Sequence, residues 1–364
     1  DYDATYQVFR AELSGEFETG DILHRLIVGV DADRFENDQV FLRVRGGQEI
    51  DLFNPVYGQY PLPKPGPNTD RVEAQESIGV YLQNQMSLTS KLDVRVGARF
   101  DDYDQELNNR RLDATTRLTE SRVSPQFGVV YKTTEAVSVY AAYGENFRPL
   151  SGSDANGNGF EPNQSTSIEA GINFELNNGA LVGNIAVFKV EQDNILVVDD
   201  PAAFTLSAIG QAESQGFEFD LYGNIADDLS LWASYSYIDA ETKNTFFDPN
   251  FGRDIPAGSP LLNIPEQQAS LQVVKSTQLG GKPVEIGGGV LHVSKRNGYF
   301  GVDFDLPSYT IARAFATYKP TDDIELRLDI DNLFDLEYYP NSFADTWVQP
   351  GTPRNIRLST AFRF

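Results

Sequence analysis

The chain alternates apolar and polar residues at a period of two over many short stretches. In the last stretch, one side carries Ile356, Leu358, Thr360, Phe362 and Phe364. The other side carries Asn355, Arg357, Ser359, Ala361 and Arg363. This period predicts a β-strand whose two faces meet different solvents. Because the apolar face ends on an aromatic residue at the C-terminus, we expect lipid rather than a protein core to cover it.

Turn signals divide the whole chain into about fifteen such stretches, joined as hairpins. The clearest turn is Asn177-Asn178-Gly179, between residues 167–176 and 181–196. Short connections alternate with long ones, which cover residues 37–71, 105–117, 147–164, 197–210 and 242–264. Tight turns at one end and long loops at the other are typical of outer-membrane barrels. We therefore predict an all-β fold, an antiparallel transmembrane β-barrel.

Composition narrows the class of protein without changing this picture. The chain has 364 residues, a net charge of -24, no cysteine and two histidines. The acidic balance argues against a nucleic-acid partner, because little in it would neutralise phosphates. No run approaches the ~20 apolar residues of a membrane helix. The 24 Phe and 17 Tyr residues suit the aromatic girdles of a barrel.

The C-terminal stretch resembles that of TonB-dependent outer-membrane receptors, and the siderophore-receptor branch (hydroxamate or ferrichrome-like) fits best. The matching features are Asn332-Leu333-Phe334-Asp335, Tyr338-Tyr339, Gly351-x-Pro353-Arg354 and the terminal Phe364. The resemblance implies a barrel of ~22 strands with a plug domain before it. We expect residues 1–364 to be the C-terminal portion of that barrel, with the plug and first strands missing. The alternative is another outer-membrane barrel that shares only the terminal aromatic signal.

The function that the resemblance implies is import of a ferric siderophore across the outer membrane of a Gram-negative cell into the periplasm. It also implies two partners besides the siderophore and the outer-membrane lipid: the TonB–ExbB–ExbD complex, which acts through the plug, and the barrel-insertion machinery, which reads Phe364. No enzyme activity and no cofactor are expected. The alternatives are a receptor for another large solute (cobalamin, haem or an oligosaccharide) and a passive porin-like barrel.

Four aromatic residues in the long connections are our candidates for substrate binding: Tyr57, Tyr60, Phe147 and Trp347. Tyr57 ends an Asn-Pro-Val-Tyr run similar to one in hydroxamate-type receptors, and the alternative is a Pro/Gly turn that aromatic residues pack. Phe147 precedes Arg148-Pro149, and a girdle position is its alternative. A ferric siderophore has its iron already coordinated, so its receptor needs stacking and hydrogen bonds rather than metal ligands.

Neither a catalytic nor a metal site is expected. Asp154 to Gly159 mimics the start of a calcium loop, but the twelfth position, where a Glu is required, is Ser165. The histidines, His24 and His292, are lone residues on predicted strands. Asp101 and Asp102 are expected at the top of a strand, as solvated charges.

Charged residues on the polar side of the strands are expected to face the lumen. They include Asp93, Arg95, Arg99, Arg327, Arg357 and Arg363. They would hold the plug or simply hydrate the lumen. The cluster Gly287-Gly288-Gly289 predicts a place where the wall meets a bulky neighbour or bends.

Overall fold

The computed structural model describes residues 1–44, 50–58, 64–154, 156–200, 205–248, 252–299 and 303–364. Its fifteen long strands form one antiparallel sheet, as predicted. They are β1 (Tyr2–Thr19), β2 (Ile22–Arg43), β3 (Gly66–Ser87), β4 (Leu92–Asn109), β5 (Ala114–Lys132), β6 (Val137–Arg148), β7 (Asn163–Leu176), β8 (Leu181–Asp200), β9 (Thr205–Ala226), β10 (Leu229–Thr242), β13 (Gln267–Leu279), β14 (Lys282–Val293), β17 (Tyr309–Thr321), β18 (Ile324–Asp331) and β21 (Asn355–Phe362). Among the described residues, no helix is long and apolar enough to cross a membrane.

Short strands lie in the long connections. They are β11 (Phe246–Asp248), β12 (Arg253–Ile255), β15 (Arg296–Asn297), β16 (Asp305–Leu306), β19 (Asn341–Ala344) and β20 (Trp347–Gln349). The sequence did not predict them, because each has only two to four residues. Periodicity cannot be recognised over so short a span.

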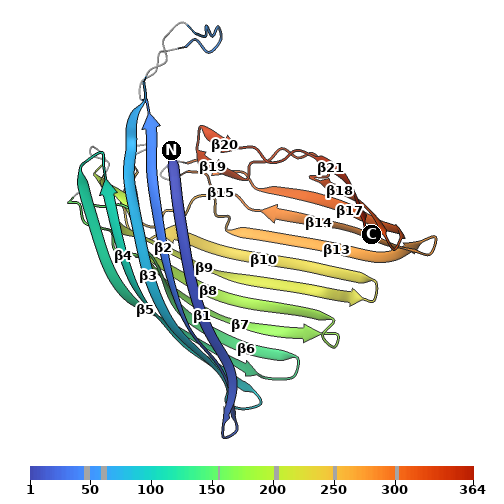
Figure 1. Ribbon diagram of the computed structural model, residues 1–364. Coiled ribbons are helices and arrows are strands. Elements are labelled where there is room, and N and C mark those ends of the chain that lie inside the picture. Colours follow the sequence, from blue (N-terminus) through green and yellow to red (C-terminus); the bar gives the residue numbers. More distant parts are fainter. Residues whose placement is uncertain (45–49, 59–63, 155, 201–204, 249–251, 300–302) are drawn as a thin grey trace.

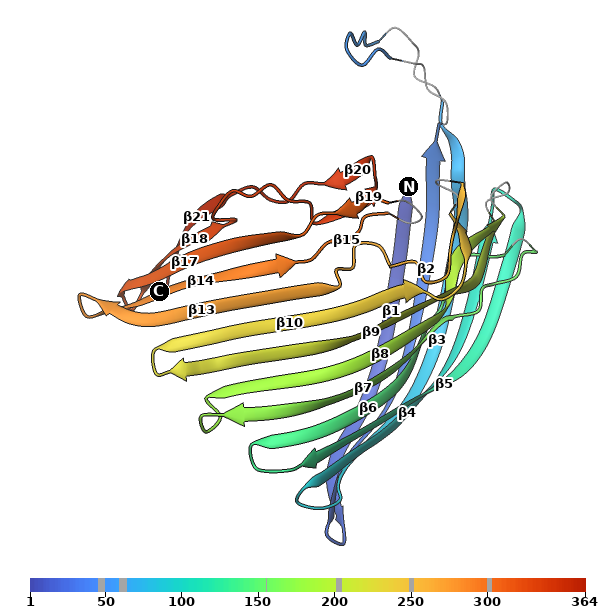
Figure 2. The same cartoon turned by 180° about the vertical axis from the view of Figure 1, so that it is seen from behind.

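Each long strand pairs with the long strand that precedes it and with the one that follows it. The ladders run without interruption from β1–β2 to β18–β21. Within the described residues, β1 pairs only with β2, and β21 only with β18. The result is a strongly curved wall whose two edges lie apart (Figures 1 and 2).

The strands continue beyond the ends that the sequence predicted. Residues 37–71 were expected to form a loop, but β2 runs to Arg43 and β3 starts at Gly66. The expectation that Asp101 and Asp102 lie at a strand top was also wrong, because β4 continues to Asn109. The hydrogen-bond ladder extends above the point where apolar residues stop, so hydropathy underestimates strand length.

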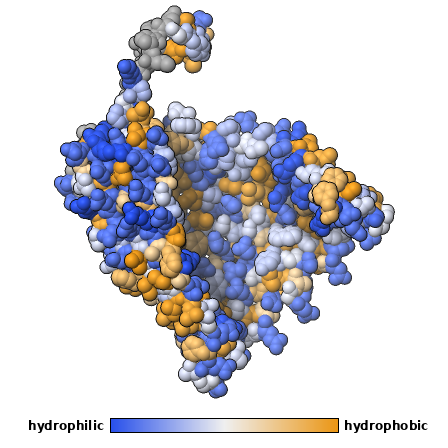
Figure 3. Space-filling view, in the orientation of Figure 1, coloured by the Kyte–Doolittle hydropathy of each residue, from blue (hydrophilic) through white to orange (hydrophobic). Residues whose placement is uncertain are grey.

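The outer face of β4 shows where the apolar surface ends. It carries Leu92, Val94, Val96, Ala98 and Phe100, followed by Asp102, Asp104 and Glu106. On β5, Val123 pairs with Phe100, and the next outer residue, Ser121, pairs with Asp102. The apolar stretch matches the ~9–11 residues with which a tilted strand crosses a bilayer. Over β1–β5 the surface is accordingly hydrophilic above and hydrophobic below (Figure 3).

On the inner face, large side chains lie flat over glycines of the neighbouring strand. Phe315 lies against its cross-strand partner Gly287, which confirms the bulky neighbour expected at the glycine cluster. Phe188 covers Gly216 in the same way. Without a Cβ on the glycine, the ring can pack along the wall instead of standing into the lumen, and it stabilises the sheet there.

We predict that Gly216→Ala destabilises the wall. The new Cβ would collide with the backbone carbonyl oxygen of Tyr237 and lie 2.9 Å from the ring of Phe188. Overpacking of this kind costs about 1–3 kcal/mol. The measurement is denaturant unfolding of the full-length receptor in lipid vesicles, followed by tryptophan fluorescence. Gly15→Ala is the matched control, since no atom lies within 4 Å of its Cβ position. Equal stability of the two variants would contradict the packing argument.

Candidate functional site: the inner wall and the extracellular rim

The first feature of the inner wall is an ion-pair cluster on β1, β2 and β4. The guanidinium of Arg99 donates to Asp31 at 2.7 and 2.8 Å, across the intervening strand β3. It also donates to Asp101 at 2.7 Å, and Arg10 of β1 lies 3.7 Å from Asp31. Gly79 of β3 makes room for the guanidinium, because a Cβ there would overlap it. The inner face thus carries charged side chains whose charges are neutralised by ion pairs.

A second ion-pair cluster lies at the opposite edge, on β18 and β21. Arg327 donates to Asp329 at 2.8 Å, and Arg357 lies 3.7 Å from the same carboxylate. The guanidinium carbon of Arg327 is 4.6 Å from the ring centre of Phe315. As predicted from alternation, Arg99, Arg327 and Arg357 lie on the inner face. Whether they hold a plug stays a prediction.

The connection between β6 and β7 folds onto the inner face of β3, β4 and β5. Ser151 donates to Glu73 at 2.7 Å, and Thr116 donates to the carbonyl oxygen of Gly157 at 3.0 Å. Phe160 of this connection is buried, and its ring packs over Gly152. The connection therefore covers part of the inner face of the wall instead of extending away from it.

Within this connection, Asp154 caps a local turn. Its carboxylate accepts the backbone N–H groups of Asn156 at 2.9 Å and Asn158 at 2.8 Å. These hydrogen bonds, led by that from Asn158, lower the pKa of the Asp154 carboxyl below its usual value. The carboxylate is used by the turn itself, which fits a loop better than a calcium site. Among the described residues, no group of three or more acidic or histidine side chains could hold a metal ion.

Three connections at the other side of the rim pack into a single cap. They are the connections from β10 to β13, from β14 to β17 and from β18 to β21. Asn263 donates to the carbonyl oxygen of Ser342 at 2.8 Å and accepts its N–H at 3.0 Å. The hydroxyl of Ser342 donates to the carbonyl oxygen of Gly298 at 2.5 Å. One residue from each connection thus meets at one point, and the cap has a fixed shape.

A buried arginine strengthens the same cap. Arg296 is 4% exposed, and it donates to the backbone carbonyl oxygens of Tyr339 and, at 2.6 Å, Pro340. Its guanidinium carbon lies 5.3 Å from the ring centre of Tyr309. Burial lowers the pKa of the guanidinium. The last connection is therefore tied to the one before it by a charged group.

The cap presents two aromatic rings to the outside. Trp347 and Phe343 lie on the hairpin of β19 and β20 and are 70% and 63% exposed. Their ring centres are 5.7 Å apart in an edge-to-face arrangement. Because Ser342, next to Phe343, is fixed by Asn263, the pair is held on a rigid support. The structure thus places Trp347 where a solute at the rim could stack on it.

Of the other three predicted ligand contacts, the two that the structure describes lie elsewhere. Tyr57 is 80% exposed on the segment 50–58, which projects beyond β2 and β3 (Figures 1 and 2). Tyr60 lies outside the described residues. Phe147 falls on the same face of β6 as Val139, which is 38% exposed on the outer wall. This register favours the girdle interpretation of Phe147. Among the described candidates, the structure does not bring Tyr57, Phe147 and Trp347 onto one element.

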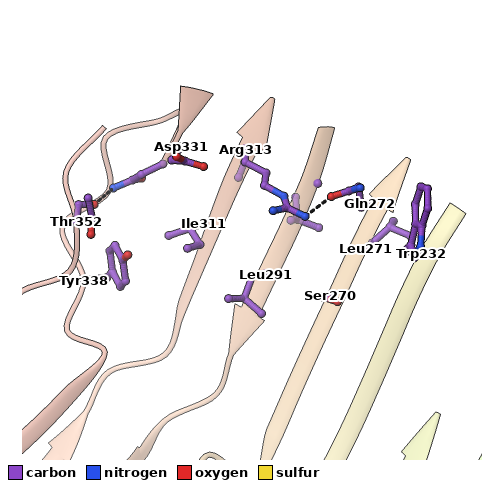
Figure 4. A pocket seen from close by; sticks show the side chains of 14 residues that line it. Trp232, Ser270, Leu271, Gln272, Leu291, Ile311, Arg313, Asp331, Tyr338 and Thr352 are labelled. Carbon is purple, nitrogen blue, oxygen red and sulfur yellow. Dashed lines mark hydrogen bonds between the residues drawn. The ribbon is translucent and has the colours of Figure 1, made fainter. Parts of the chain in front are cut away.

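A cavity of about 590 Å³ lies on the inner face below the cap. One cross-strand row of its lining consists of Trp232, Gln272, Gly289 and Arg313, on β10, β13, β14 and β17. Arg313 donates to the side-chain oxygen of Gln272 (Figure 4). The sequence analysis missed Trp232. The available signal was its position in the polar row of β10, among Ser230, Ser234 and Ser236.

Comparison with known proteins identifies the family to which this chain belongs. The model for "TonB dependent receptor-like, beta-barrel" matches residues 1–333. The metal-pseudopaline receptor CntO of Pseudomonas aeruginosa is 32% identical over 375 residues, covering 100% of this chain and 52% of that protein. The ferrioxamine B receptor of Salmonella typhimurium is 29% identical, over 97% of this chain and 49% of the receptor. The chain thus spans about half the length of the curated relatives it matches.

A solved structure has the same fold. The ferric-catecholate import receptor Fiu of Escherichia coli K12, in its closed form, superposes with a TM-score of 0.82 at 20% identity, covering 100% of this chain and 55% of that one. The wall described above thus has the fold of that barrel. On the family match, the chain belongs to the TonB-dependent receptors, a family of outer-membrane β-barrels that transport and do not catalyse.

Proposed function

We propose that the protein to which this chain belongs imports a ferric siderophore across the outer membrane. The observation that carries the proposal is the exposed Phe343–Trp347 pair, held by a rigid cap directly above a water-facing inner wall. A ferric chelate presents organic surface and carbonyl oxygens, which aromatic rings and hydrogen-bond donors can bind without contacting the iron. Relatives named as receptors for metal-pseudopaline and ferrioxamine B support a substrate among metal complexes and siderophores, the class to which a ferric siderophore belongs.

The energy source and remaining parts belong to the same proposal. We assign the chain to the C-terminal portion of the barrel, with the plug and the other strands supplied by preceding sequence. The match to about half of each relative's length supports this assignment. The TonB–ExbB–ExbD complex would act on the plug to release bound chelate to the periplasm. The barrel-insertion machinery would read Phe364, which follows β21.

The uptake test described below would also detect import of a different solute. A haem receptor would be expected to present histidine at its rim. The two histidines lie instead on wall strands, where His24 stacks on Phe17 with ring centres 4.7 Å apart and His292 hydrogen-bonds Thr310 at 2.8 Å. Cobalamin or an oligosaccharide would use the same rim, and a passive porin would need no energy coupling.

We predict that cells lacking the protein no longer grow when its ferric siderophore is their only source of iron. The measurement is growth and ⁵⁵Fe uptake on iron-chelated medium supplemented with single siderophores, with and without the full-length gene. Restored uptake of at least one ferric siderophore is expected. Restored transport of cobalamin, haem or an oligosaccharide alone would contradict the iron assignment. Uptake that continues unchanged without TonB would indicate a passive barrel.

We further predict that Trp347→Ala weakens binding of the transported ferric siderophore about tenfold, since a well-placed aromatic contact contributes on the order of 1–2 kcal/mol. Equilibrium binding to the purified full-length receptor measures the effect. Phe334→Ala is the matched control, because Phe334 is a 77% exposed aromatic residue of the same connection that lies outside the hairpin. A larger loss in the control than in Trp347→Ala would contradict the role given to the rim pair.

A further inference from the structure

We propose that Asn263 is a positioning residue for substrate recognition at the rim: it completes the hairpin of β19 and β20 from a separate connection and so fixes the Phe343–Trp347 pair. The inference rests on the proposed function, because it concerns the aromatic pair to which that function assigns the chelate. Asn263 lies in the connection between β10 and β13, whereas the rings lie in the connection between β18 and β21. It would act on the solute only through the two rings.

The hairpin that carries the two rings is too short to hold its shape alone. β19 and β20 have four and three residues and pair with each other in a separate two-stranded sheet. An isolated two-stranded hairpin is at best marginally stable in water. The register also shifts between Ser342 and Ala344, which leaves Phe343 in a bulge. Because a bulge disrupts the ladder locally, the direction of the Phe343 ring needs support from outside the hairpin.

The side chain of Asn263 takes the place of a third strand beside this hairpin. On one edge, Ser342 pairs with Val348 of β20. On the other edge, the Asn263 amide donates to the carbonyl oxygen of Ser342 at 2.8 Å and accepts its N–H at 3.0 Å. These are the two backbone groups that the next strand of a sheet would bind. One amide side chain therefore completes the hairpin at the residue directly before Phe343.

Asn263 is itself held in place and can serve as a fixed support. Its backbone N–H donates to the carbonyl oxygen of Asn297 at 2.9 Å, in the connection between β14 and β17. Its φ of 61° is left-handed, a conformation that asparagine adopts more readily than most residues. Asn263 thus links all three connections of the cap. It belongs to the first, its backbone binds the second, and its side chain binds the third.

Burial along β19 shows which way the tethered strand directs its side chains. Ser342 and Ala344 are buried, whereas Phe343 between them points outward, as alternation in a strand requires. Trp347 then meets Phe343 edge to face. Without the tether the two rings would still be exposed but would no longer be fixed relative to each other. A solute would have to order them on binding, and that ordering cost weakens affinity.

The first measurement asks whether Asn263 orders the hairpin in the absence of any ligand. Asp345→Cys places a nitroxide spin label at an exposed position of the hairpin in the full-length receptor, since residues 1–364 contain no cysteine. We expect Asn263→Gly to make the label more mobile, because glycine keeps the left-handed backbone and removes only the amide. Asn178→Gly is the matched control and should leave mobility unchanged. Asn178 has a φ of 56° and lies in the turn between β7 and β8, at the opposite end of the wall (Figure 1).

The second measurement is binding of ferrioxamine B to the purified full-length receptor, or of the siderophore with the highest ⁵⁵Fe uptake if ferrioxamine B does not bind. We expect Asn263→Gly to weaken binding about three- to tenfold, and no more than Trp347→Ala does, because it acts only through the rings. In the Trp347→Ala background the same substitution should weaken binding less than about twofold, since the effects of coupled residues do not add. Asn178→Gly should have no effect in either background.

Three results would overturn the inference. A label at position 345 that is equally mobile with and without Asn263→Gly would show that the hairpin is ordered without the amide. A loss of affinity of equal size with and without Trp347 would mean that Asn263 supports the rim in general. A mobilised hairpin with unchanged affinity would mean that the tether does not serve recognition. In all three cases the import function stands if the gene restores siderophore uptake. Binding and uptake of no siderophore would instead contradict the import function, and the inference with it.

Discussion

The structure depends on one constraint: a single layer of β-sheet separates two solvents. On β4, Val96 and Phe100 face outward and are 44% and 46% exposed, although both are apolar. On the opposite face of the same strand, Arg99 and Asp101 form ion pairs. In the part of the chain that the structure describes, no second layer covers the apolar face, and in water it would be an aggregation surface. Lipid outside and water inside make the same pattern favourable.

This constraint explains how the inner face is built. Charged groups on it are paired across strands, as between Arg99 and Asp31, and aromatic rings lie flat over glycines, as Phe188 does over Gly216. Both devices keep large side chains close to the wall and leave the interior free.

The sequence predicted the part of the fold that period two encodes. Alternation and turn residues gave the strand order, the hairpins and the direction in which Arg327 and Arg357 point. They did not give the upper ends of β2 and β3, because both faces of a strand above the bilayer meet water and the alternation loses contrast. They also could not give the cap, whose central contact joins Asn263 to Ser342, 79 residues later. Such a contact depends on the folded wall that brings the connections together.

The most direct test of the two-solvent wall is site-directed spin labelling along β4. The chain contains no native cysteine, so single cysteine substitutions from residue 92 to 104 introduce one labelling site each in this region. In the full-length receptor in lipid vesicles, labels at 94, 96, 98 and 100 should be accessible to oxygen dissolved in lipid. Labels at 95, 97 and 99 should instead be accessible to a water-soluble nickel reagent, as should the outer positions 102 and 104. An accessibility profile without a period of two, or with oxygen contact on the inner positions, would contradict this account.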